Sequence, residues 1–222
     1  MINNYCTKVV QLLIFQSNLL VKLQISETAY QNVTALIKNN NGFYVVLSII
    51  KIFIDLSKKL NVKDLSLINE LMKCNRLPKD ITREKNRFHK KIIKNFQEIS
   101  MDKYGCCFIQ KYYKLVENSI ESFRFNIMEQ IFQNTTLFIK HKYAHFIIQF
   151  LIMENNKKYI DFLIELVSYS CIEYCCDEIS SRIIEKLISS NEIDCDKFVI
   201  SILNSKFQIL FLNKNGNKSK QF

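Results

Sequence analysis

Residues 104–110 read YGCCFIQ, residues 143–149 read YAHFIIQ and residues 179–185 read ISSRIIE. Each stretch has a leading residue, a small residue, two variable positions, two apolar residues and a final polar residue. We call the last five residues of such a stretch a block. Further stretches are YCTKVVQ at 5–11, NGFYVVL at 41–47 and, less regularly, FQILFLN at 207–213. A pattern that returns along a whole chain indicates an internal repeat.

The distances between blocks define the repeat. The first residues of successive blocks are separated by 36, 63, 39, 36 and 28 residues. A period of this size is typical of a stacked unit of two or three elements, whose apolar face is buried only by its neighbours. The last step is too short for a whole repeat, so we expect the block at 209–213 to be a terminal cap.

Composition favours helices. The chain has 222 residues, 48% of them hydrophobic, but only three Gly and one Pro, too few for the turns of a many-stranded protein. Amphipathic stretches at 120–132 and 159–167 have helical periodicity. The sequence therefore predicts an all-α solenoid of five or six repeats over residues 1–212, followed by a disordered tail at 213–222.

The 63-residue step needs a separate explanation. It contains Pro78 and a basic stretch, residues 76–94, with eight Lys or Arg against Asp80 and Glu84. We interpret residues 76–95 as a basic insertion, and a degenerate repeat hidden within 48–105 is the alternative. Such a run is more often a solvated surface than a specific site, although its cations could also contact phosphates.

Charge and cysteine content limit the class of protein. The net charge of +10 suits a polyanionic partner, although an AT-rich genome would also enrich Lys. Lys51 and Asp55 interrupt the best apolar run, so we expect no membrane span, and the N-terminus does not resemble a signal peptide. The eight irregularly spaced cysteines favour reduced thiols and an intracellular protein.

The sequence gives little support for a catalytic site or a metal site. Cys171, Cys175 and Cys176 are close in sequence, but no nearby His or second CxxC completes a zinc site. No nucleophile, base and orienting acid occur together. We therefore expect no metal, no cofactor and no enzymatic activity.

On a helix, the first and fifth residues of a block share a face, and the second is offset on the same surface. The first and fifth side chains can hold a base edge while the second stacks between bases. The segments YGCCFIQK, KYAHFIIQ and SSRIIEK resemble the RNA-reading helices of the Pumilio (PUF) family, most clearly over residues 97–190 and more weakly over 1–60. The resemblance implies a right-handed, armadillo-like solenoid of three-helix repeats, forming a crescent that binds single-stranded RNA as a monomer.

The resemblance also implies a base for each block. Ser181 with Glu185 would read guanine, His145 with Gln149 uracil and Cys106 with Gln110 adenine. His145 replaces the usual Asn of the family. Because repeats run antiparallel to the RNA, these blocks spell G-U-A, the core of a UGUA element. Thr7 with Gln11 would read adenine or uracil, and the expected stacking residues are Lys8, Tyr44, Cys107, Phe146 and Arg182.

Two blocks depart from this scheme, since Phe43 with Leu47 and Ile209 with Asn213 lack a complete edge-reading pair. The resemblance implies recognition of mRNA untranslated regions in the cytoplasm and repression through protein effectors. A nucleolar Pumilio-like factor in ribosomal RNA processing and an armadillo or HEAT-like protein scaffold are the alternatives. Base-reading pairs separate the first two functions from the third, because a protein scaffold has no need of them.

Overall fold

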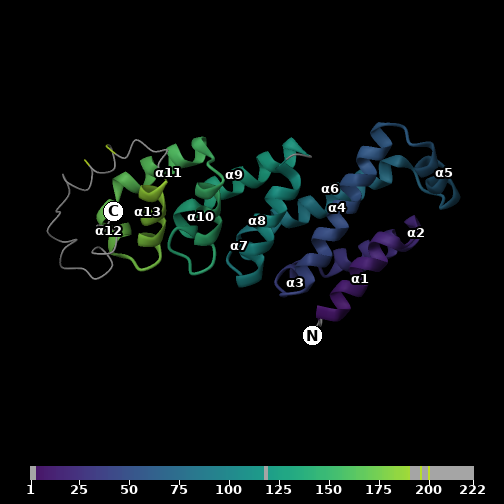
Figure 1. Ribbon diagram of the computed structural model, residues 1–222, viewed down its shortest axis with the longest axis horizontal. Helices are drawn as coiled ribbons and strands as arrows, with labels where there is room; N and C mark the ends of the chain where they lie inside the picture. Colours follow the sequence, from purple (N-terminus) through teal and green to yellow (C-terminus); the bar gives the residue numbers. More distant parts are fainter. Residues whose placement is uncertain (1–3, 118–119, 191–195, 197–199, 201–222) are drawn as a thin grey trace. The chain divides into compact units, whose positions relative to one another are not determined.

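The computed structural model describes residues 4–117 and 120–190 together with residues 196 and 200 (Figure 1). These residues form thirteen α-helices and no strand, which confirms the prediction of an all-α repeat protein. Within this part of the chain, every helix is too short or too polar to cross a membrane.

The helices fall into two compact units, Met1–Gln130 and Ile131–Phe222, and the boundary lies inside one helix, α9. A single repeat domain over 1–212 stays a prediction. The bounds are α1 Asn4–Gln16, α2 Leu19–Gln31, α3 Val33–Ile37, α4 Gly42–Asn61, α5 Leu65–Lys73, α6 Pro78–Lys94, α7 Phe96–Ser100, α8 Lys103–Glu117, α9 Glu121–Phe138, α10 His145–Met153, α11 Lys157–Tyr169, α12 Cys171–Cys176 and α13 Ser180–Ser189.

The helices follow a recurring order of a short helix and then a block-bearing helix, which in one case is followed directly by a longer third helix. This order is seen in α3–α4, in α7–α8–α9 and again in α12–α13. Each short helix contacts the block-bearing helix that follows it, so the two form one packing unit. Blocks therefore lie near the N-termini of α4, α8, α10 and α13.

The structure differs from the interpretation of residues 76–95 as an insertion. Residues 78–94 form the regular helix α6, which packs against α4 (Figure 1). Ile81, Phe88 and Ile92 are fully buried on one side of α6. The basic segment is thus the third helix of the repeat that begins with α3. The extra length comes from α5 and from α4, which reaches 20 residues, rather than from a hidden repeat.

A side-chain acceptor stands four residues before each of four blocks and fixes the start of the block-bearing helix. At α8, Asp102 Oδ1 accepts hydrogen bonds from the backbone N–H groups of Tyr104 and Gly105, at 2.8 and 2.9 Å. Such bonds satisfy N–H groups that the first turn of a helix leaves unpaired. The acceptors of the four blocks are Asn39, Asp102, His141 and Asp177.

Gly105 allows α7 and α8 to approach closely. A Cβ atom added there would lie 2.0 Å from the carbonyl oxygen of Ile99, which forces the two helices apart. We expect Gly105→Ala to destabilise the first unit by about 1–3 kcal/mol, the usual cost of overpacking. Urea unfolding followed by circular dichroism measures this decrease. An unchanged midpoint would show that α7 and α8 do not approach this closely.

Candidate nucleic-acid interface

The blocks on α4, α8, α10 and α13 share one pattern of burial. The first, third and fourth residues are buried, the second is exposed and the fifth is half-buried. This pattern brings the second and fifth side chains to the surface on one side of each helix, whereas the side chain of the first residue is almost completely covered. The first residues of these blocks are Phe43, Cys106, His145 and Ser181.

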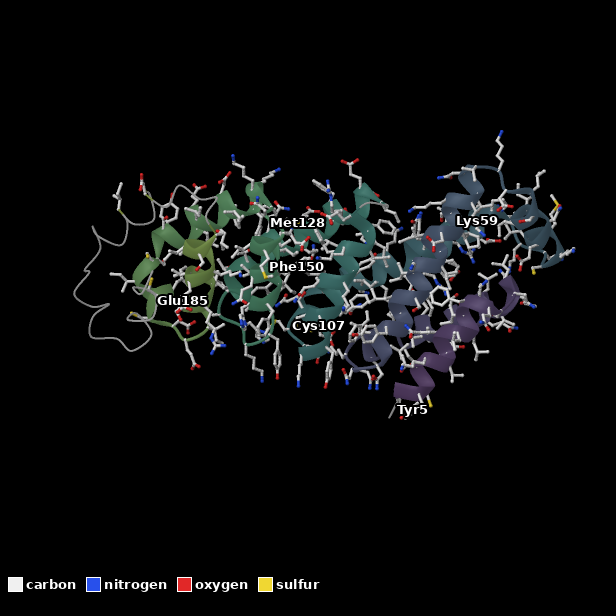
Figure 2. All side chains as sticks on the ribbon, viewed as in Figure 1. Tyr5, Lys59, Cys107, Met128, Phe150 and Glu185 are labelled. Carbon is white, nitrogen blue, oxygen red and sulfur yellow. The ribbon has the colours of Figure 1, made fainter. Side chains whose placement is uncertain are left out.

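On α13, the block Ser181–Glu185 presents a carboxylate and a guanidinium. Ser181 is only 2% exposed, and its hydroxyl donates to the Glu178 carbonyl at 3.2 Å. Arg182 is exposed, with Nη2 3.4 Å from Glu178 Oε1. Glu185, labelled in Figure 2, forms no ion pair with any described residue. Its carboxylate is therefore free to accept hydrogen bonds from a ligand.

On α8, the block Cys106–Gln110 is neutral. The Cys106 thiol donates to the Lys103 carbonyl at 3.2 Å, and burial raises the pKa of this thiol to about 12. Cys106 therefore remains a protonated thiol at neutral pH. Cys107 is exposed on the same helix (Figure 2), and Gln110 is half-buried. The Gln110 amide is therefore the main group of this block that can form a hydrogen bond with a ligand.

His145 on α10 is held inside the protein. It is 2% exposed, and its Nδ1 lies 2.9 Å from the His141 carbonyl oxygen, which assigns the ring proton to Nδ1. Nε2 is covered and has no hydrogen-bond partner among the described residues. Burial lowers the pKa of the His145 imidazole, so the ring is neutral at pH 7. A base edge can reach Nε2 only if this side chain moves.

The other residues of this block lie nearer the surface. Phe146 is 43% exposed, and its ring centroid lies 4.0 Å from that of His145. Gln149 is half-buried one turn beyond His145. In this conformation, stacking by Phe146 and hydrogen bonding by Gln149 are the contacts that the block offers.

The two earlier blocks are less suited to reading bases. Tyr44 is exposed and its ring stacks on buried Phe43 at 4.0 Å, but the block has no polar fifth residue. In the first block, Gln11 Nε2 donates to Ser48 Oγ at 2.9 Å, so this amide already has a partner on α4. The remaining expected contacts there are Thr7, which is buried, and Lys8, which is exposed.

Some expectations lie outside the described residues. These are the sixth block at 209–213 and the tail at 213–222. For the cysteines, Cys171 and Cys175 approach each other, with their sulfur atoms 3.8 Å apart, as hydrogen-bonded thiols. Over the described ranges, no group of three or more His, Cys, Asp or Glu side chains is arranged to hold a metal ion.

The family model of the Pumilio-family RNA binding repeat matches residues 95–111 and 170–194. These two segments contain the blocks of α8 and α13. Two segments of the chain thus match the Pumilio-family repeat, and the fold described above agrees with that match. No curated protein matches the sequence.

Solved structures of Pumilio-family proteins have the same fold. PUF-8 in complex with PBE-RNA has a TM-score of 0.68 and 17% identity, covering 98% of this chain and 57% of PUF-8. PUF-6 in complex with 5BE13 RNA has a TM-score of 0.62 and 17% identity, covering 96% of this chain and 68% of PUF-6. The RNA-binding domain of yeast Puf5p bound to SMX2 RNA has a TM-score of 0.55 and 21% identity, covering 97% of this chain and 68% of the Puf5p chain. This chain thus spans little more than half of the PUF-8 chain.

The capping acceptors are a feature of these repeats that the block pattern alone does not include. They would emerge from the sequence if each block were extended by four residues toward the N-terminus, where Asn, Asp, His and Asp stand in turn. His141 conceals the pattern, because it accepts through a ring nitrogen, Nδ1, instead of a side-chain oxygen.

Proposed function

We propose that the chain binds single-stranded RNA in a sequence-specific manner through its Pumilio-type blocks. The observation that carries the proposal is the α13 block, which lies on a helix that the family model matches. It presents the Glu185 carboxylate, which has no ion pair with any described residue, and the exposed Arg182 guanidinium. A carboxylate pairs with the N1–H and N2–H donors of guanine, and a guanidinium plane can stack on a base.

For the target we propose a UGUA-like element in mRNA 3′ untranslated regions. The order of the blocks along the chain supports guanine, then uracil, then adenine, with Gln149 carrying more of the uracil contact than His145. The RNA-binding domain of the similar protein Puf4 has been solved with an HO endonuclease RNA 3′ UTR recognition sequence. The role we propose is post-transcriptional regulation in the cytoplasm by a non-catalytic monomer that recruits protein effectors.

Fluorescence anisotropy at physiological salt tests this proposal. One labelled strand contains UGUA, and the other differs only in its guanine. A preference of tenfold or more for the first strand supports base reading. Equal affinity would contradict it and leave either a sequence-independent RNA binder or a protein scaffold.

The Glu185 carboxylate gives the sharpest test by mutation. We expect Glu185→Ala to weaken binding to the UGUA strand by about 1–3 kcal/mol, and to the strand without guanine much less, because only guanine offers the two donors. Glu165→Ala removes an exposed carboxylate from α11, outside any block, and should leave both affinities unchanged. An equal decrease on both strands with Glu185→Ala would show that Glu185 does not read the base.

A further inference from the structure

We infer that α6 carries a second nucleic-acid contact, which binds the phosphate backbone without reading bases. The contact consists of Lys79, Arg83, Lys90 and Lys94, all of them exposed, and we call it the α6 basic face. It goes beyond the proposed function, because none of its residues belongs to a block.

The α6 basic face is continuous along the helix. With 100° between successive residues, its four cations fall within about 60° of one another and opposite the buried side that packs on α4. From Lys79 to Lys94 the helix rises about 22 Å, at about 1.5 Å per residue. The face can therefore lie along several consecutive phosphates while it points away from the block-bearing helix α4.

The cations of this face have no directly bonded carboxylate among the described residues. Both carboxylates of α6 are used elsewhere, since Asp80 Oδ2 accepts from the Leu77 backbone N–H and Glu84 pairs with Arg87. Arg87 also binds Glu27, at 2.7 Å. In the described part of the chain, Lys79, Arg83, Lys90 and Lys94 form no ion pair.

This arrangement is unfavourable for the isolated helix. Lys79 with Arg83 and Lys90 with Lys94 are like-charged pairs four residues apart, which destabilise a helix. Packing does not require them, because their side chains are exposed. A polyanion lying along the face would remove the repulsion and release its own counterions.

The chemistry of the face favours phosphates over a protein partner. A shallow groove along it is lined by Lys79, Thr82, Arg83, Asn86, Arg87 and Lys90, without an aromatic or aliphatic residue. Protein interfaces are depleted in Lys and centre on buried aromatic anchors. Arg, Lys, Thr and Asn are the side chains that contact phosphate oxygens. The face has no aromatic platform for successive bases and no pair of side chains that would read a base edge, so its binding should be independent of sequence.

The test uses the full chain and a labelled 20-nucleotide oligocytidine, which lacks the UGUA element. The variant Lys79→Gln/Arg83→Gln/Lys90→Gln removes three charges from the face. We expect it to bind oligocytidine at least tenfold more weakly. Its plot of log affinity against log salt should be less steep by about 2, because each phosphate that a cation neutralises on a single strand adds about 0.7 to the slope. An RNA duplex of the same length tests whether a double-stranded backbone is bound as well.

A matched variant controls for net charge. Lys73→Gln/Lys157→Gln/Lys158→Gln removes three exposed lysines from α5 and α11 and should leave affinity and salt dependence nearly unchanged. Equally weakened binding in both triple variants, or unchanged binding in the α6 variant, would overturn the inference. So would a labelled 20-residue polyglutamate peptide that binds the α6 basic face as tightly as RNA, since the partner would then be an acidic protein.

Base reading and backbone binding can fail separately. The α6 variant should keep its preference for UGUA over the strand without guanine, because Glu185 is intact. Conversely, Glu185→Ala should bind oligocytidine as the unmodified chain does. Absence of guanine preference in the unmodified chain would refute the proposed function and leave the α6 measurement valid.

Discussion

Replacing Phe88 by alanine is expected to lower the free energy of unfolding of the first unit by about 3–5 kcal/mol, the usual cost of removing a buried phenyl ring. Phe88 is fully buried on α6. Its ring centroid lies 5.5 Å from that of Tyr30 on α2 and 6.5 Å from that of Phe53 on α4. The substitution therefore leaves a cavity where three helices meet.

Urea unfolding of the full chain measures the decrease, and Lys90→Ala on the exposed side of α6 is the matched control, with a change of about 0.5 kcal/mol or less. The comparison separates a helix of the core from a surface insertion. A decrease below about 1 kcal/mol in Phe88→Ala would mean that α6 packs loosely against α4, as a surface insertion would.

The first unit is also expected to lose about 3 kcal/mol of stability between pH 7 and pH 4 because of His89. Burial lowers the pKa of His89 from 6.5 to about 4. As the pH falls below 6.5, the unfolded chain binds a proton that the folded chain does not, so unfolding becomes easier. The pKa difference, at about 1.4 kcal/mol per unit, gives the size of the effect.

The surroundings of His89 explain why its neutral form is preferred. The Asn126 amide Nδ2 donates to His89 Nε2 at 3.1 Å, which leaves Nδ1–H to donate to the Tyr112 hydroxyl at 2.8 Å. The ring also stacks on Phe123, at 3.7 Å between centroids. Protonation of Nε2 would place a donor against the Asn126 donor in a buried site.

The pH effect is measured as the difference between the unmodified chain and His89→Asn, each unfolded in urea from pH 7 to pH 4. His89→Asn lowers stability at pH 7 but lacks this titration, so the gap between the two proteins should narrow as the pH falls. Taking the difference between the two proteins cancels the contributions of other titrating groups. One of these is Glu84: burial raises its pKa, so its contribution to stability increases as the pH falls, opposite to that of His89. A gap that stays constant would contradict the assignment to His89.

The sequence predicted the helical phase of the blocks well. Two apolar residues in the third and fourth places identify the buried side, as Ile183 and Ile184 show, and this fixes the second residue outward. The near-complete burial of the first residue was not predictable from one helix. Periodicity places Ser181 and Glu185 on a common face, but how far neighbouring helices cover Ser181 depends on packing.

The role of residues 78–94 was harder to predict. Eight cations in residues 76–94 conceal an apolar side made by Ile81, Phe88 and Ile92, spaced as on a helix. Charge describes the exposed side of a helix, whereas spacing identifies the buried one. A count of basic residues therefore suggested an insertion where the apolar spacing indicated a core helix.

The capping acceptors have a consequence for insertions and deletions. Asp102 and Asp177 each stand four residues before a block, and their hydrogen bonds set where the block-bearing helix begins. One residue inserted between acceptor and block would rotate all five side chains by about 100°. Residues added after the block, as in the long α4 and the additional α5, leave that orientation intact. This chain can thus tolerate length changes behind each block but not in front of it.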